Sequence, residues 1–317
     1  KAITQYGHRV WKVQDGLPQD SIQAIAQTPD GYLWLGTRGG LVRFDGLQFE
    51  PCSRSMACTK EVSGSAAQGL KADIVNALLV TRDGSLWIGQ ENEVLTRFKD
   101  SQFQTVDPLR HIENGKYSLS FVRALWEGRE GDLWVGQYGS GLFHLKGQET
   151  TRFPTPDLLV RAVWGDGQGN LWVGTQNGLC RLQDGKCVCY NTGEGLSHNF
   201  VQALYQDRHG TLWVGTRGGL TSYQAGRFRR FTTHDGLSHE DITALLEDRD
   251  GNLWIGTQQG GLNRHRDGHF TAFTKAEGLS DNQVQSLYED REGNLWVGTQ
   301  NGLNRFHDQR FTSYTVK

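Results

Sequence analysis

Short runs of alternating apolar and polar residues, separated by glycine-containing turns, return seven times along this chain. In the fifth return, residues 200–206 are rich in apolar side chains, residues 211–216 alternate, and residues 220–223 and 227–232 are short runs between further turns. Alternation with a period of two between turn residues is typical of β-strands. We therefore predict that each return forms four antiparallel strands, named a to d in chain order.

One tryptophan marks every repeat, because each strand b carries the sequence Leu-Trp-apolar-Gly. The seven are 38 to 53 positions apart, close to the 40–45 residues that four strands and their turns require. One such sheet cannot bury both of its faces, whereas seven sheets packed around an axis can. The sequence predicts an all-β fold in which residues 1–317 form a single seven-bladed β-propeller. The predicted core residues between its blades are Trp34, Trp87, Trp134, Trp172, Trp213, Trp254 and Trp296.

The two ends of the chain compete to complete the ring. Residues 9–14 resemble a strand d without the strands that should precede it, and residues 310–315 resemble a strand d for the last repeat. We expect the N-terminal strand to close the ring, and the C-terminal segment to lead towards a following module. Closure by the C-terminal segment remains the alternative.

Two repeats are longer than the others because of insertions at residues 51–65 and 107–117. Both extend a connection from strand d to the next strand a, so we expect them to rise on one face of the ring. Extended loops on one face of a repeat array often mark its binding face.

Charge and hydropathy exclude some classes of partner. The net charge of −2 offers no attraction to nucleic acid or to an anionic membrane surface. The mean hydropathy is −0.56 and no run of about 18 apolar residues occurs, so we predict no membrane insertion by this chain.

Five cysteines raise the question of disulfides. If residues 184–185 form a two-residue turn, Cys180 faces Cys189 across the hairpin, and a cross-strand bridge becomes feasible. Cys52 and Cys58 could close a short loop in the same way. Free or buried thiols are the alternative. No second cysteine pair or histidine cluster accompanies Cys187 and Cys189, so we predict neither a metal site nor a cofactor.

The repeats combine Asp-Gly-Leu-Ser or Asp-Gly-Leu-Pro, an apolar strand, and Asp-x-x-Gly-Asn-Leu-Trp-Val-Gly-Thr. This pattern, with the opening segments 8–11, 15–21 and 31–37, resembles the two-component regulator propeller family over essentially the whole chain. Such propellers form the extracytoplasmic part of bacterial receptors, which continue into a membrane helix and a kinase, cyclase or transcription-factor output. The resemblance implies a periplasmic sensor domain, separated from its downstream modules, that works in a receptor homodimer. Several family members sense oligosaccharides.

Polar residues recur at one position of strand a, the strand expected to surround the central channel. They are Gln23, Asn76, Arg123, Arg161, Gln202, Thr243 and Gln285. The turns between strands b and c add Arg38, Tyr138 and Arg217, and a loop from d to a adds His239. Amides and guanidinium groups could hold a sugar or a small acid, and Arg123 with Arg161 could grip a carboxylate. The alternative is that these side chains only solvate a water-filled channel.

Three classes of function remain. We expect a sensor domain that binds a small polar ligand, a carbohydrate by the family resemblance, and that is not an enzyme. A propeller that binds another protein without any small ligand is the first alternative. A propeller lyase or hydrolase is the second, with His239 and Glu240 as its candidate groups, although no nucleophile, metal or nucleotide motif occurs.

Overall fold

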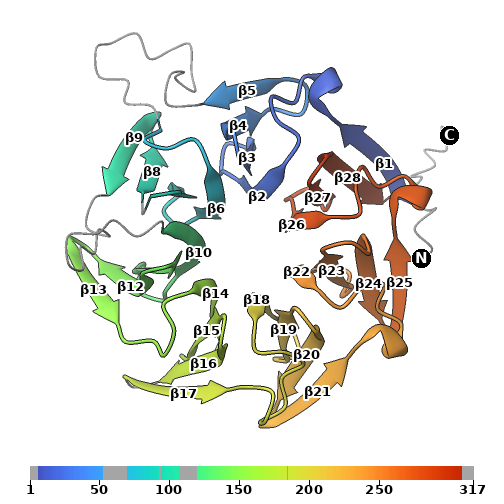
Figure 1. Cartoon of the computed structure of the whole chain (residues 1–317). Helices are drawn as coiled ribbons and strands as arrows, with labels where there is room; N and C mark the ends of the chain where they lie inside the picture. The colour runs from blue at the N-terminus through green and yellow to red at the C-terminus, as the bar shows by residue number, and fades with distance from the viewer. Residues whose placement is uncertain (1–5, 53–69, 93, 107–119, 184, 309–317) are drawn as a thin grey trace, which may run out of the picture.

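In the computed structural model, which describes residues 6–52, 70–92, 94–106, 120–183 and 185–308, seven four-stranded antiparallel sheets surround a central channel (Figure 1). This confirms the seven-bladed propeller. Blade 1 consists of β2 Ile22–Gln27, β3 Leu33–Thr37, β4 Gly40–Phe44 and β5 Phe49–Cys52; blade 2 of β6 Val75–Val80, β7 Leu86–Gln90, β8 Leu95–Lys99 and β9 Gln102–Val106; and blade 3 of β10 Phe121–Glu127, β11 Leu133–Tyr138, β12 Gly141–Lys146 and β13 Glu149–Phe153. Blade 4 consists of β14 Val160–Gly165, β15 Leu171–Thr175, β16 Gly178–Gln183 and β17 Lys186–Tyr190; and blade 5 of β18 Val201–Gln206, β19 Leu212–Thr216, β20 Gly219–Gln224 and β21 Arg227–Phe231. Blade 6 consists of β22 Ile242–Glu247, β23 Leu253–Thr257, β24 Leu262–Arg266 and β25 His269–Phe273; and blade 7 of β26 Val284–Glu289, β27 Leu295–Thr299, β28 Gly302–Asp308 and β1 Tyr6–Trp11.

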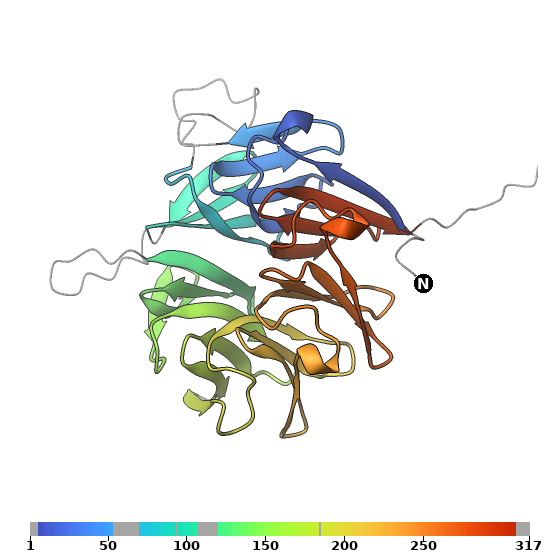
Figure 2. The same ribbon diagram turned by 45° about the vertical axis from the view of Figure 1, so that its right-hand side comes forward.

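The seventh blade is closed by the N-terminal strand, as expected. β1 pairs with β28 along its whole length, from Tyr6 opposite Asp308 to Trp11 opposite Leu303. Figure 2 shows the dark-blue β1 lying against the red β28. The competing segment 310–315 and the two insertions at 51–65 and 107–117 lie outside the described residues, apart from the end of β5. No helix in the described ranges is long and apolar enough to span a membrane. Short 3₁₀ turns, η2 Val13–Asp15, η3 Thr233–Asp235 and η4 Lys275–Glu277, follow three of the outer strands.

In blades 4 to 7 an aspartate shapes the turn that precedes the tryptophan. In blade 6 the Asp248 carboxylate accepts the backbone N–H of Asp250 at 3.0 Å and that of Asn252 at 2.8 Å, and the Trp254 indole N–H at 2.7 Å. The same indole bond to an aspartate occurs in blades 4, 5 and 7. The aspartate thus fixes the turn and satisfies the buried indole, and a buried N–H without a partner would be costly.

Arginines join neighbouring blades on the face that carries these turns. The Arg208 guanidinium of blade 5 donates to the Glu247 carboxylate at 2.6 Å and to the Asp248 carbonyl at 2.5 Å, both in blade 6. Arg249 repeats the arrangement with Glu289 at 2.7 Å between blades 6 and 7. Arg82 pairs with Glu127 between blades 2 and 3 at 3.2 Å. These contacts add to the apolar packing between the blades.

The hairpin of β16 and β17 carries the expected disulfide. Cys180 lies opposite Cys189, and their sulfur atoms are bonded. Cys58, the expected partner of Cys52, lies outside the described residues, so that bridge stays a prediction. Cys187 is an exposed free thiol. Its sulfur lies within 4.8 Å of those of Cys180 and Cys189, but the bridge leaves only one of the three able to act as a thiolate ligand.

Candidate functional site

The predicted polar ring of strand a is built by seven β-bulges. In β2, Ile22 pairs with Thr37 and Ala24 pairs with Gly36, so Gln23 has no partner in the ladder. A bulge takes its residue out of the normal alternation and re-aims its side chain. The same shift occurs at the equivalent residue of every innermost strand, namely Asn76, Arg123, Arg161, Gln202, Thr243 and Gln285.

These seven side chains come together at a single cavity of about 270 Å³ in the channel. Arg38, Gln258 and Gln283 complete its lining. The turns between strands b and c lie beside it, because their backbone N–H groups donate to the connections from d to a. Gln258 N–H donates to the Asp241 carbonyl at 2.9 Å, and Gln300 N–H donates to the Gln283 carbonyl at 2.9 Å. The two sets of loops therefore share one face with the channel mouth, as expected.

On one side of this cavity, the polar side chains form hydrogen bonds with one another and with neighbouring backbone. Gln23 Nε2 donates to Gln285 Oε1 at 2.7 Å, and Gln285 Nε2 donates to Gln300 Oε1 at 2.6 Å. Gln202 Nε2 donates to Asp241 Oδ1 at 2.5 Å. Thr243 Oγ1 donates to a backbone carbonyl at 2.7 Å. On the side of blades 5, 6, 7 and 1, the polar ring is thus bonded within itself.

The other half, formed by blades 2 to 4, has donors without acceptors. Asn76 Nδ2 and Arg123 Nε are buried and have no hydrogen-bond partner. Within the described part of the chain, neither Arg123 nor Arg161 forms an ion pair. The pKa of Arg123 is lowered to about 10, first by burial and then by the neighbouring cations of Arg161 and Arg38. Burial also lowers the pKa of Arg161. Two partly buried cations thus stand at the cavity without an anion.

Aromatic rings hold the guanidinium groups at the mouth of the channel. The Arg161 guanidinium carbon lies 5.1 Å from the centre of the Phe200 ring and 5.5 Å from that of Tyr138. The Arg217 guanidinium carbon lies 3.8 Å from the Phe200 ring centre. Such contacts between cations and ring faces orient a guanidinium without neutralising its charge. Arg217 and Tyr138 therefore support the site from outside the cavity lining.

Of the remaining predicted site residues, one lines the cavity and one does not. Arg38 lines the cavity, whereas His239 does not. His239 Nδ1 instead accepts the backbone N–H of Asp241 at 3.0 Å, and Glu240 accepts the Thr233 hydroxyl at 3.1 Å. Both side chains hold the loop that leads into β22. Gln283 was missed by the sequence reasoning, although its position two residues before Gln285 in the loop entering β26 could have indicated it.

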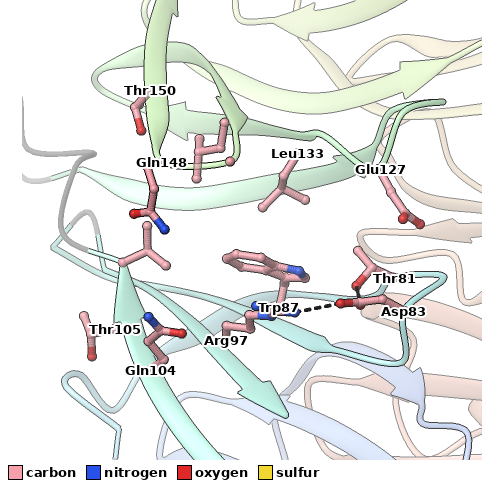
Figure 3. A pocket seen from close by; sticks show the side chains of 14 residues that line it. Thr81, Asp83, Trp87, Arg97, Gln104, Thr105, Glu127, Leu133, Gln148 and Thr150 are labelled. Atoms are coloured by element: carbon pink, nitrogen blue, oxygen red, sulfur yellow. Dashed lines mark hydrogen bonds and ion pairs between the residues drawn. The ribbon is translucent and has the colours of Figure 1, made fainter.

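A second hollow of about 440 Å³ lies between blades 2 and 3 (Figure 3). Trp87 lies on one side and Leu133 on the other, with Gln104 and Gln148 at the outer end (Figure 3). On the same side as Trp87, Arg97 pairs with Asp83 at 2.6 Å (Figure 3). Trp87 is only half-buried, whereas Trp254 is fully buried.

This hollow, called the slot below, exists because blade 3 lacks an aromatic pair that is found in most other blades. Strands c and d oppose two aromatic rings in blades 1, 2, 5, 6 and 7, with ring centres 4.2 to 4.7 Å apart. In blade 3 the same positions hold Leu145 opposite Thr150. Leu145 packs in one apolar cluster with Trp87 and cannot cover it as a ring would. The hollow is thus explained by packing.

Replacing Thr150 with phenylalanine is expected to fill this slot and to raise the free energy of unfolding by about 1 kcal/mol, because a ring would be buried against Trp87. Urea denaturation measures the change. Thr151→Phe, on the exposed face of the same strand, is the matched control and should bring no gain. Equal midpoints for the two variants would contradict the packing explanation.

Comparison with known proteins agrees with the repeats and with the propeller fold. A family model described as the two component regulator propeller matches residues 16–39, 195–218, 236–259 and 278–301. These segments are repeats of that family. The recognition made from the sequence motifs is thereby confirmed. No match was found among curated proteins.

Solved structures share the fold of this chain at low sequence identity. The extracellular domain of a putative hybrid two-component system from B. thetaiotaomicron has a TM-score of 0.77 and 22% identity, over 98% of this chain and 45% of that one. The extracellular domain of a putative one-component system from the same organism has a TM-score of 0.73 and 21% identity, over 98% and 40%. This chain therefore spans less than half of those two. Virginiamycin B lyase from Staphylococcus aureus has a TM-score of 0.71 and 13% identity, over 95% and 99%.

Proposed function

We propose that this propeller is the ligand-sensing domain of a bacterial receptor of the two-component type, exposed in the periplasm. Its ligand is a small polar molecule of the carbohydrate class, bound at the channel mouth, and occupancy changes how two receptor chains associate. The observation that carries the proposal is the convergence of seven bulged polar side chains on one cavity, with unpaired donors on blades 2 to 4. The matched repeats and the extracellular receptor domains with the same fold support it.

The two alternatives find less support. A protein-binding face should show a broad apolar patch, but the large exposed apolar side chains of the described residues are Val13, Leu47, Leu158 and Val188, which stand on separate segments. The lyase with the same fold supports the enzyme alternative. However, His239 and Glu240 are committed to backbone and hydroxyl contacts of their own loop.

Thermal denaturation of this domain with neutral and acidic oligosaccharides tests the proposal. A ligand at about 100 times its dissociation constant should add about 2.7 kcal/mol to the free energy of unfolding. We expect that stabilisation to disappear in Asn76→Ala and to persist in Gln224→Ala, which changes an exposed amide at the end of β20. Stabilisation that survives Asn76→Ala would place the ligand elsewhere, and turnover of the ligand would overturn the non-enzymatic reading.

A further inference from the structure

We infer that the ligand carries an acidic group, a carboxylate or a sulfate, whose oxygens lie between Arg123 and Arg161. This inference rests on the proposed function, because it assumes that the channel mouth is the binding site. It goes further in excluding neutral sugars as the main ligand. The reasons are the kind of unpaired atoms in the cavity, the balance of charge around it, and its size.

The buried atoms of the cavity lining that lack a hydrogen-bond partner are donors. Asn76 Nδ2 and Arg123 Nε are buried without a partner, and no buried acceptor of the described lining residues is left in that state. A neutral sugar presents hydroxyl groups that both donate and accept, so it makes less use of unpaired N–H donors than an anion does. An ionised carboxylate or a sulfate only accepts, and it can take several N–H bonds at once. The unpaired donors on blades 2 and 3 therefore favour an anion.

The charge around the cavity is also unbalanced. Arg38 and Arg161 both lower the pKa of Arg123, and Arg217 lowers that of Arg161, so the four guanidinium groups repel one another. Among the described residues, Asp241 is the carboxylate that acts in the opposite direction on Arg161. Its Oδ1 already accepts a hydrogen bond from Gln202. A bound anion would supply the charge that two desolvated cations lack.

The size of the cavity limits what can enter. At about 270 Å³ it is at the lower end of small-molecule sites, which run from about 300 to 1,000 Å³. It therefore suits one acidic sugar unit, either free or at the end of a chain, with the other units outside the mouth. Carboxylate and sulfate share the recognition chemistry, so the experiment must separate them.

Calorimetric titration of the whole domain with three matched disaccharides makes that separation. One ends in glucuronate, one in glucose and one in glucose sulfate. We expect at least one acidic disaccharide to bind about 100-fold more tightly than the neutral one, a fold-change of the size that a bidentate charged pair supplies. Its affinity should fall at least about 30-fold in Arg123→Gln and in Arg161→Gln, and stay unchanged in Arg227→Gln, which alters an exposed arginine on β21. Circular dichroism confirms that each variant folds.

The outcomes distinguish the two levels of the proposal. If the neutral disaccharide binds as tightly as the acidic ones and Arg123→Gln does not weaken it, the acidic ligand is wrong while the sensor function stands. If none of the three binds, inorganic sulfate decides. Millimolar sulfate should raise the melting temperature of the unaltered domain more than that of Arg123→Gln, because only the former has both arginines. If sulfate raises the two melting temperatures equally, the anion site is wrong. Because no sugar has bound in that case, the result would also count against the sensor function.

Discussion

The Trp11→Ala variant is expected to lose about 3 to 5 kcal/mol of its free energy of unfolding, the usual range for removing a buried large aromatic side chain. Trp11 is 3% exposed and lies at the last residue of β1. Its ring centre is 5.5 Å from those of Trp296 in blade 7 and Phe44 in blade 1. The residue therefore locks the strand that closes the ring to the first blade. Urea denaturation followed by tryptophan fluorescence measures the loss.

Val13→Ala is the matched control for this result. Val13 stands two residues further along the chain and is 55% exposed, so its truncation should change the free energy of unfolding by less than about 0.5 kcal/mol. If Trp11→Ala unfolds at the same urea concentration as Val13→Ala, the N-terminal strand does not hold the ring closed. The segment at residues 310–315 would then become the candidate for closure.

The Arg123→Met variant is expected to be more stable than the unaltered protein when no ligand is bound, by about 3 kcal/mol. The pKa of Arg123 is lowered from the usual arginine value to about 10, so the folded state disfavours its charge. Each pKa unit corresponds to about 1.4 kcal/mol, and methionine removes the charge while keeping much of the side-chain volume. Binding of an acidic ligand should be lost in the same variant. Stability and function would thus oppose each other at this residue.

The pH dependence of this difference follows from the sign of the shift. The folded pKa lies below the unfolded one, so the destabilising effect of the charge is complete below about pH 10 and fades as the pH rises from there towards the unfolded pKa of arginine. The stability gap between Arg123→Met and the unaltered protein should therefore narrow above pH 10. Arg227→Met, at an exposed arginine, should show no gap at any pH. A gap of zero at neutral pH would mean that Arg123 is already neutralised within the protein.

If both results hold, the channel mouth is a site whose charge is poorly tolerated until a ligand arrives. An anion would then stabilise the propeller by relieving repulsion among its arginines, besides adding contacts of its own. Such a ligand-dependent gain in stability is one way in which occupancy could alter the association of two receptor chains.

The repeat pattern by itself determined the fold of this protein. The alternation around residues 200–232 predicted β18 to β21 to within one residue at the compared ends, and the register of Cys180 opposite Cys189 followed from counting outwards from one turn. These features depend on contacts within a blade, between residues close in the sequence. The position of the polar ring was predictable for the same reason, because every repeat places a polar residue at one point of strand a.

Only the tertiary structure decided which of those polar residues are available to a ligand. Gln23 and Gln285 are similar in sequence context to Asn76 and Arg123, yet the first two bond to each other across blades 1 and 7 and the last two have unpaired donors. Likewise, the slot beside Trp87 in blade 2 depends on the side chain of blade 3 that packs against it, which is Leu145. The sequence of one repeat records its own strands, whereas pairing, burial and charge at the channel depend on side chains from separate blades, whose distances are set only when the ring closes.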